Sequence, residues 1–385
     1  MLINDLNDDC LLLIFSYIND FYDQLNISQV CSRWSSLLSI RYNRKKLLLC
    51  WSSYSGPDEV EYITRAPNFI RNNITRLLPS VQLLDVNFKH HRDLTIDKLN
   101  EIGQNHLNIK GIVVQKGCID LFLLLCFPNI EMLVCSYLLH NKNYPFDISK
   151  LRQLYIRNGS LKVLSRYGRS LNNLQRLHLY QGQHFEVYSG EIIPNLRILE
   201  YDSENDRELE NDFDGFHFMD FCPSLESAYL AHRSKKCIMD SKNLNLNLRD
   251  LVILQKLENP YEECLPYSDI FAKFPNLVNL AIRNSNDIDN DDIIEFVKLL
   301  PKVKLLDFQG SPKITSKAAD LLSDYCKESG RSIEIKFGGR LRNDAIWMDF
   351  NSFTENIVFE LNFMDHCFNQ PFEKIPILMV SRLAS

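Results

Sequence analysis

An apolar run near the N-terminus is the first feature of the hydrophobic pattern. From residue 10 to 18 it is interrupted by one polar residue, Ser16, and it predicts a short helix with no solvent-facing side. Asp8 and Asp9 precede the run, where the helix dipole favours negative charge, and Asn7 is the expected N-cap. The run is too short to span a membrane, which needs about 20 apolar residues. A helix apolar all round predicts burial on every side, in a large core or between its own domain and a partner.

A second pattern recurs through the middle of the chain. Ten segments share the form apolar-x-x-apolar-x-apolar, usually introduced by Pro-Asn or a close variant, as in FPNLVNLAIRN at 274–284. A period of roughly 20–29 residues is typical of leucine-rich repeats. The first apolar position of each segment recurs every 21 to 29 residues, at Val81, Ile109, Ile130, Leu151, Leu174, Leu196, Leu225, Leu248, Leu277 and Val303.

Each repeat predicts one strand and one helix. The last two apolar positions of a segment alternate at the strand period, so both face inward while their neighbours face outward. Helical patterns fall between the segments, for example at 293–297 and 318–322. Because neither element can bury its apolar face alone, stacking predicts one continuous core and a curved parallel sheet. The predicted fold class is α/β, a repeat solenoid over residues 78–339, and a two-layer globular α/β fold is the alternative.

The two ends of the chain do not fit the repeats. Residues 52–77 are expected to form a helical linker. Residues 340–385 are rich in aromatic side chains, which a disordered tail would lack, and predict a folded C-terminal cap over the last repeat. A cap that folds back toward the concave face of the sheet is the second possibility.

Residues 1–51 resemble the F-box family. Its signature is a Leu-Pro-acid start, an apolar helix and a later Val-Cys-x-x-Trp, which correspond here to Leu6-Asn7-Asp8, the helix at 11–18 and the segment at 30–34. Asn7 replaces the usual proline, and the loop at 19–23 departs from the family in length. The resemblance implies an all-α domain of three helices that binds a Skp-type adaptor, with a plain helical cap of the solenoid as the alternative. The implied adaptor-binding residues are Leu6, Leu11, Ile14, Phe15, Ile18, Val30, Cys31 and Trp34.

An F-box followed by leucine-rich repeats resembles a substrate receptor of a cullin-type (SCF) ubiquitin ligase, which binds a protein substrate and performs no chemistry. A repeat scaffold that does not engage the ubiquitin machinery is the alternative. The sequence has no Gly-rich phosphate loop, HExxH or GxSxG motif, so no catalytic residue and no cofactor are expected. The acidic run at 287–292 lacks the glycine and the glutamate of a calcium loop, so it predicts a loop and first helical turn, and no metal site is expected.

Charge and cysteine content restrict the partners and the compartment. The net charge of −6 gives no support for binding to nucleic acid or an anionic membrane. The eleven cysteines are scattered and form no CxxC pair, which argues against a disulfide framework or a zinc site. A reducing compartment, the cytoplasm or the nucleus, is therefore expected.

The outward positions of the repeats predict the substrate-binding surface. In each segment the second and fourth residues after the first apolar position line the concave face, which is the default binding surface of a solenoid. Tyrosine and arginine gather there, and these residue types are enriched in binding hot spots, although strands also favour aromatic and long side chains in general. The predicted substrate-binding residues are Tyr155, Arg157, Arg176, His178, Tyr180, Glu200, Asp202 and Tyr229.

One acidic segment stands apart from the repeat pattern. Residues 202–214 hold seven acids against Arg207. Such a charge block predicts a solvated, mobile loop, and contact with a basic partner is the alternative.

Overall fold

The structure is a computed structural model that divides into two compact units, Met1–Phe146 and Asp147–Ser385, and each is described by itself. In the part of the chain that the structure describes, no helix is long and apolar enough to cross a membrane. The described residues are 2–18, 21–42, 47–49, 60–62, 80–85, 96–114, 118–119, 122–138, 148–181, 187–203, 212–234, 236–256, 265–339 and 357–380.

Three helices open the first unit: α1 (Asp8–Ser16), α2 (Phe21–Ser28) and α3 (Ser32–Tyr42), preceded by the 3-10 turn η1 (Ile3–Asp5). The predicted N-cap is confirmed, because the Asn7 side chain accepts a hydrogen bond of 2.8 Å from the backbone N–H of Cys10. Phe15 and Trp34 pack edge to face in the core of the three helices, with ring centroids 5.3 Å apart.

Parallel strands follow in the first unit, in the order β2-β1-β3-β4-β6. They are β1 (Leu47–Leu49), β2 (Val60–Tyr62), β3 (Leu83–Asp85), β4 (Gly111–Val113) and β6 (Met132–Cys135). The helices α5 (Ile96–Asn105) and α6 (Phe122–Cys126) and the small pair β5 (Cys118–Ile119) and β7 (Tyr137–Leu138) complete the unit.

The predicted helical linker over residues 52–77 is wrong where the structure describes it. Residues 60–62 form β2, which pairs in parallel with β1. Valine and tyrosine at 60 and 62 are strand-favouring residue types, and pairing with β1 satisfies their backbone groups. The 47–49 segment, assigned by sequence to the N-terminal helical domain, belongs to the sheet through its pairing with β3. The rest of the expected linker lies outside the described residues.

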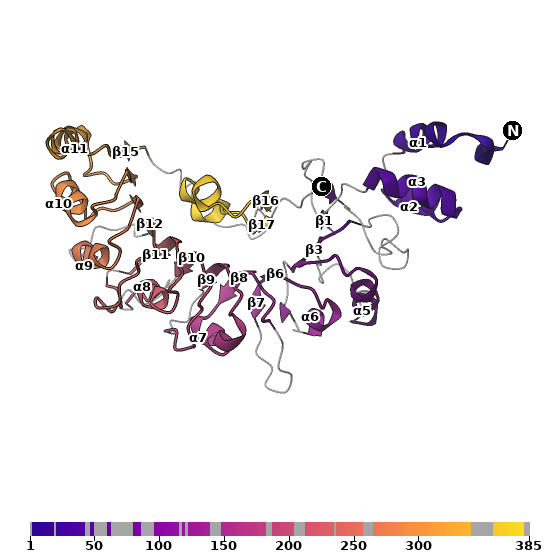
Figure 1. The fold of residues 1–385 in the computed structure, drawn as a ribbon, viewed down its shortest axis with the longest axis horizontal. Coiled ribbons are helices and arrows are strands. Elements are labelled where there is room, and N and C mark those ends of the chain that lie inside the picture. The colour runs from indigo at the N-terminus through magenta and orange to yellow at the C-terminus, as the bar shows by residue number, and fades with distance from the viewer. Residues whose placement is uncertain are drawn as a thin grey trace. The chain divides into compact units, whose positions relative to one another are not determined.

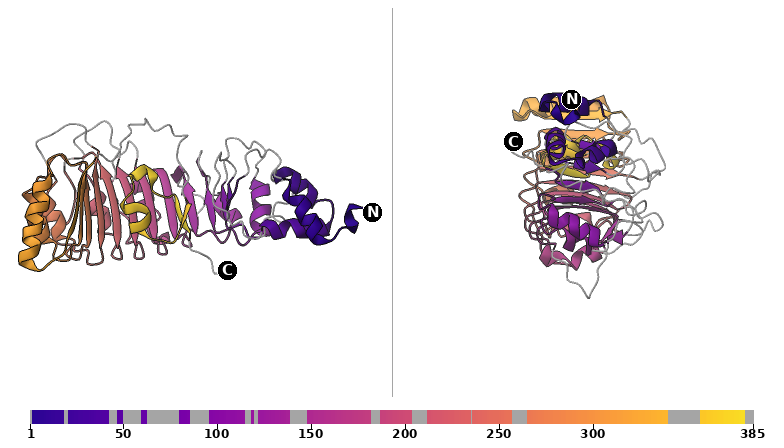
Figure 2. Two further views of the ribbon diagram at one scale, coloured as in Figure 1. Left: turned by 90° about the horizontal axis from the view of Figure 1, so that it is seen from above. Right: turned by 90° about the vertical axis from the view of Figure 1, so that its right-hand side faces the viewer.

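The second unit contains a sheet in which strands β8 to β15 lie in chain order and pair in parallel. Helices cover one face of this curved sheet (Figure 1), and Figure 2 (left) looks onto the other face, where the strands lie side by side. The strands are β8 (Gln153–Gly159), β9 (Arg176–Gln181), β10 (Ile198–Ser203), β11 (Ser227–His232), β12 (Asp250–Gln255), β13 (Asn279–Arg283), β14 (Leu305–Gln309) and β15 (Glu334–Gly338). The helices are α7 (Leu161–Ser165), α8 (Gly215–Met219), α9 (Tyr267–Ala272), α10 (Asp292–Leu299) and α11 (Ser316–Ser329).

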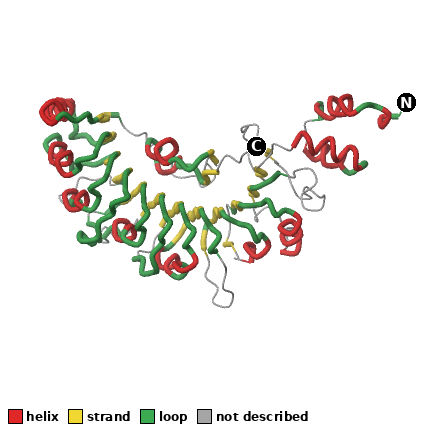
Figure 3. Tube along the Cα trace, in the orientation of Figure 1, coloured by secondary structure: helices red, strands yellow, loops and turns green. Residues whose placement is uncertain are grey.

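The predicted fold class is confirmed: N-terminal helices precede a parallel sheet with helices, as expected of an α/β repeat solenoid. Figure 3 shows the alternation of strand and helix in the repeats. Each of the ten repeated segments contains a strand that begins two residues after its first apolar position. The alternate strand residues, such as Leu177, Leu179 and Leu199, are fully buried under the helices. The two sequence-predicted helical stretches lie within α10 and α11, and the acidic run at 287–292 leads into α10 as expected.

The recurring Pro-Asn has a structural explanation. The asparagine side chain before the first apolar position donates a hydrogen bond to a backbone carbonyl of the preceding repeat. Asn173 donates to Ser149 (2.7 Å), Asn195 to Asn172 (2.6 Å) and Asn276 to Leu246 (2.8 Å). These bonds satisfy carbonyl groups in the turns that lead into the strands, and so fix the spacing of successive repeats.

The C-terminal segment, residues 357–380, lies on the sheet face opposite the helices (Figures 1 and 3). It comprises β16 (Ile357–Phe359), the π-helical turn η4 (Met364–Phe368), the 3-10 turn η5 (Phe372–Lys374) and β17 (Leu378–Val380). The expected cap over the last repeat is therefore wrong for the described residues, which fold back onto the concave face. The physical reason is that the outward side chains of the middle strands offer an apolar surface to the phenylalanines of this segment.

Candidate functional site

Helix α1 has two apolar faces with different surroundings. Leu11 and Phe15, one helical turn apart, are 0% and 2% exposed and pack into the three-helix core. Leu13 and Tyr17, also one turn apart, are 59% and 77% exposed, and Ile14 beside them is 39% exposed. Residues four apart share a face of a helix, so the exposed side chains form one continuous apolar stripe. Among the described residues only one face of the helix is covered, which rules out burial in a large core and leaves the other expectation, burial between its own domain and a partner, as a prediction.

The residues predicted to bind an adaptor divide between these two environments. Leu11, Phe15 and Trp34 belong to the core of the helical domain, whereas Ile14 and Val30 are exposed. Leu6, Ile18 and Cys31 are partly buried. Sequence analysis missed the further exposed side chains Leu2, Ile3, Leu13 and Tyr17. The four-residue spacing groups Leu11 with Phe15 and Leu13 with Tyr17, but it does not show which of the two groups is exposed.

Arg33 fixes the chain segment that enters α1. Its guanidinium donates to the backbone carbonyls of Asn4 and Leu6, each at 2.7 Å, and to the carboxylate of Asp8. The ion pair with Asp8 is exposed and contributes little free energy. The two carbonyl contacts hold the first residues of the chain next to α3, and so position Leu2 and Ile3 near the start of α1.

Comparison with known proteins identifies this helical region. Residues 3–49 match the F-box-like family, and the helical region they contain is called the F-box-like domain below. No curated protein matches the sequence. A chain in the crystal structure of the Rad7 and Elc1 complex in yeast is similar over 66% of this chain and 85% of that chain, at 15% identity and a TM-score of 0.28.

The predicted substrate-binding residues come together on the concave face of the second unit. The strand register places Tyr155 beside His178, and His178 beside Glu200, which lies beside Tyr229. Their outward orientation follows the predicted alternation, but the C-terminal segment contacts the middle of the set, at Arg176, His178, Glu200 and Tyr229. Six of the eight are buried and two are partly buried: the buried ones are Tyr155, Arg176, His178, Glu200, Asp202 and Tyr229, and the others are Arg157 and Tyr180. Their role in binding a substrate stays a prediction.

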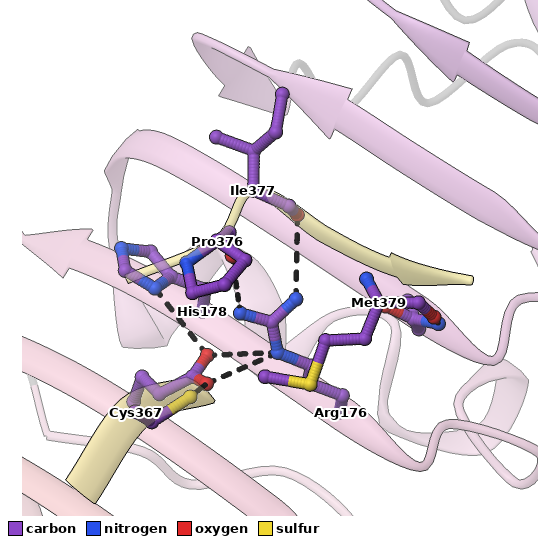
Figure 4. Close-up of polar contacts among 8 residues, drawn as sticks. Arg176, His178, Cys367, Pro376, Ile377 and Met379 are labelled. Atoms are coloured by element: carbon purple, nitrogen blue, oxygen red, sulfur yellow. Dashed lines mark hydrogen bonds and ion pairs between the residues drawn. The ribbon is translucent and has the colours of Figure 1, made fainter. Parts of the chain in front are cut away.

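A buried charge network occupies the centre of this face (Figure 4). The Arg176 guanidinium donates to both carboxylate oxygens of Glu200 at 3.0 and 3.1 Å, and Nδ1 of His178 lies 3.3 Å from the same carboxylate. Burial opposes ionisation of Glu200, but Arg176 and His178 outweigh it and hold the Glu200 pKa below its ordinary value. Burial lowers the pKa of His178, so a neutral imidazole beside a charged Glu200 is the stable arrangement.

Two further cation–carboxylate pairs flank this network. Lys256 pairs with Asp202, and its ammonium lies 3.7 Å from Glu373 of the C-terminal segment. Arg283 pairs with Asp307 at 2.6 Å, and both side chains are buried. Charges in a low-dielectric interior are stable only when paired and hydrogen-bonded. Under the covering segment these charged side chains are therefore stable only as pairs.

The acidic segment at 202–214 is not solvated at its ends. Asp202 and Asp214 are buried, which corrects the expectation of a solvated loop there, and residues 204–211 lie outside the described part of the chain. The Tyr201 hydroxyl donates to Asp214 at 2.7 Å, and burial raises the pKa of Asp214 to about 6. Burial also lowers the pKa of nearby His232, on the adjacent strand β11, to about 4.

None of the described residues forms a group of three or more His, Cys, Asp or Glu side chains that could hold a metal ion.

Proposed function

We propose that this chain is a non-catalytic substrate receptor of a cullin-type ubiquitin ligase. In this role the F-box-like domain binds a Skp-type adaptor, which connects it to the cullin scaffold, and the repeat unit holds a protein target. The observation that carries the proposal is the exposed apolar stripe of α1 within a domain that matches the F-box-like family. The described cysteines are free, which fits a cytoplasmic or nuclear protein.

The physical argument rests on the free energy of covering that stripe. Each large apolar side chain removed from water contributes roughly 1.5–3 kcal/mol, of which the cost of association offsets a part. Leu13, Ile14, Tyr17 and Val30 are available for such burial, because they are exposed while the core beneath them is already packed. An apolar patch of this kind on a folded domain is typical of a surface that a partner protein covers.

The test is co-expression of the full chain with a Skp-type adaptor, followed by affinity capture. The wild-type chain is expected to capture the adaptor, and Leu13→Asp is expected to abolish capture without unfolding the domain. Leu125→Asp is the matched control, because Leu125 is 61% exposed on α6, outside the F-box-like domain, and Leu13 is 59% exposed. If the wild-type chain captures no adaptor, the chain is a repeat scaffold outside the ubiquitin machinery.

A further inference from the structure

The backbone of the C-terminal segment accepts and donates hydrogen bonds with side chains of the concave face, in addition to the packing of its apolar side chains. The side-chain amide of Gln153 makes a reciprocal pair with Met379, since its Nε2 donates to the Met379 carbonyl and its Oε1 accepts from the Met379 N–H at 3.1 Å. Arg176 donates to the carbonyls of Pro376 and Ile377, as Figure 4 shows. Side chains of β8 and β9 thus recognise an extended backbone.

The same mode of contact continues along the next strands. Arg283 donates to the Phe368 carbonyl at 2.7 Å and the Gln370 carbonyl at 3.4 Å, and the Tyr229 hydroxyl donates to the Gln370 carbonyl at 3.2 Å. Hydrogen bonds to backbone carbonyls do not depend on which side chains the bound segment carries. The face therefore has general contacts for a peptide, spread over β8, β9, β11 and β13.

Specific contacts centre on one aromatic ring. The Phe372 ring lies 4.7 Å from the His178 ring and 5.4 Å from the Tyr229 ring, and the Lys256 ammonium lies 5.8 Å from its centroid. Glu373, the next residue, lies within ion-pair distance of the same Lys256. An aromatic anchor in a buried pocket beside a charge pair is the arrangement of a binding hot spot.

The segment is also separate from the sheet that it covers. Its strands β16 and β17 pair with each other in a small sheet of their own. Among the described residues, no backbone–backbone hydrogen bond joins 357–380 to strands β8 to β15. The sheet beneath has its own core under the helices, so removing the segment would leave the strand ladder intact.

We propose that the concave face is a peptide-binding surface, that residues 357–380 are its tethered occupant, and that a target protein binds by displacing them with a segment of the same chemistry. The matching segment is extended and carries an aromatic residue followed by an acid, with Pro and apolar residues four to seven positions further on, as in Phe372, Glu373, Pro376 and Met379. This inference names the class of target that the proposed receptor would bind, and that part of it rests on the proposed function. A tether typically gives an effective concentration of about millimolar, so free segments compete poorly until the tethered one is released.

The experiment uses the full chain with a protease site inserted between residues 340 and 356. After cleavage the segment is held only by its contacts, and a fluorescent synthetic peptide of residues 357–380 is added while anisotropy is measured. The labelled peptide is expected to bind the cut chain and to bind the uncut chain at least ~100-fold more weakly. A peptide with Phe372→Ala should bind the cut chain about tenfold or more weakly, whereas the control Lys374→Ala, at an exposed position, should bind as the parent does.

Three results would overturn the inference. In the first, the cut chain retains its segment and does not exchange it for excess peptide. In the second, the cut chain unfolds when the segment leaves. Either result would show that residues 357–380 are an integral part of the fold. Equal binding of the Phe372→Ala and Lys374→Ala peptides would show that the contact is not specific. No adaptor is present in this experiment, so its failure is separate from a failure of adaptor capture.

Discussion

The F-box-like domain and the concave face of the repeat unit differ in the chemistry of their surface residues and in whether the chain covers them. On α1 the exposed residues include an apolar stripe, and within the described chain nothing covers Leu13 or Tyr17. On the concave face the outward residues include three cation–carboxylate pairs, and the chain's own C-terminal segment covers them. Apolar side chains can stay in water at modest cost until a partner arrives, whereas paired charges in a buried site depend on every contact being kept. The difference predicts that mutations of the exposed stripe affect adaptor binding, whereas loss of one member of a buried charge pair on the concave face affects stability.

The largest expected effect is at the centre of the concave face. Arg176→Ala leaves Glu200 buried without its cation, and should lower the free energy of unfolding of the repeat unit by about 3–5 kcal/mol. Urea denaturation followed by circular dichroism measures the loss. The control is Arg169→Ala, which removes an ion pair that is 86% and 58% exposed and should leave the midpoint unchanged. Equal midpoints for the two variants would show that the covered face is not a buried charge network.

A pair of substitutions on α1 tests the two faces of one helix. Leu11→Ala removes a fully buried side chain and should lower the free energy of unfolding of the F-box-like domain by about 2–5 kcal/mol. Leu13→Ala should leave that stability unchanged and weaken adaptor capture instead. Thermal melts and capture assays on both variants separate the effects, and a stability loss for Leu13→Ala would contradict the exposed stripe.

The pH dependence of stability tests the burial of Asp214. The folded-state pKa is about 6 and the ordinary value is 3.8, so between these values the folded chain binds more protons than the unfolded chain. The contribution of Asp214 to the free energy of unfolding therefore falls as the pH rises from about 4 to about 6, by about 3 kcal/mol in total. Asp214→Asn keeps an oxygen for the Tyr201 hydroxyl and should be more stable than the wild type above pH 6, and equal to it near pH 4. Parallel stability curves for the two chains from pH 4 to 7 would show that Asp214 is not buried as a carboxylate.

The smallest expected effect is at the start of α1. Asn7→Ala removes the side-chain acceptor for the Cys10 N–H and should lower the stability of the F-box-like domain by about 1 kcal/mol. Asn7→Ser should restore most of the loss because serine is also a good N-cap. A melting temperature that does not distinguish alanine from serine would mean that the cap contributes nothing.

The periodic part of the fold could be predicted from the sequence, and the long-range contacts could not. The repeated apolar spacing predicted every strand from β3 to β14 except β5 and β7, because alternation reports directly which side chains face the helices. It also placed Tyr155, Arg176 and Glu200 correctly on the outward face. It could not show their burial, since polar outward residues look the same whether water or another segment covers them. Gln153 and Met379 are 226 positions apart, and no local pattern predicts such a contact.

The same limit applies to α1. An uninterrupted apolar run indicates total burial, but it does not say which face its own domain covers. Leu11 and Phe15 face the core because α3 supplies Trp34 on that side. The exposed face becomes visible only when the packing of the three helices is known.

The most direct test of the central comparison is amide hydrogen exchange on the full chain, alone and with a Skp-type adaptor. The adaptor is expected to protect residues 2–18 and the turn at Val30, and to leave strands β8 to β13 and residues 357–380 unchanged. Hydrogen exchange reports the local opening and burial of each segment, so one measurement covers both the F-box-like domain and the concave face. If α1 gains no protection in the presence of the adaptor, its exposed apolar stripe is not the docking surface, and the account is contradicted.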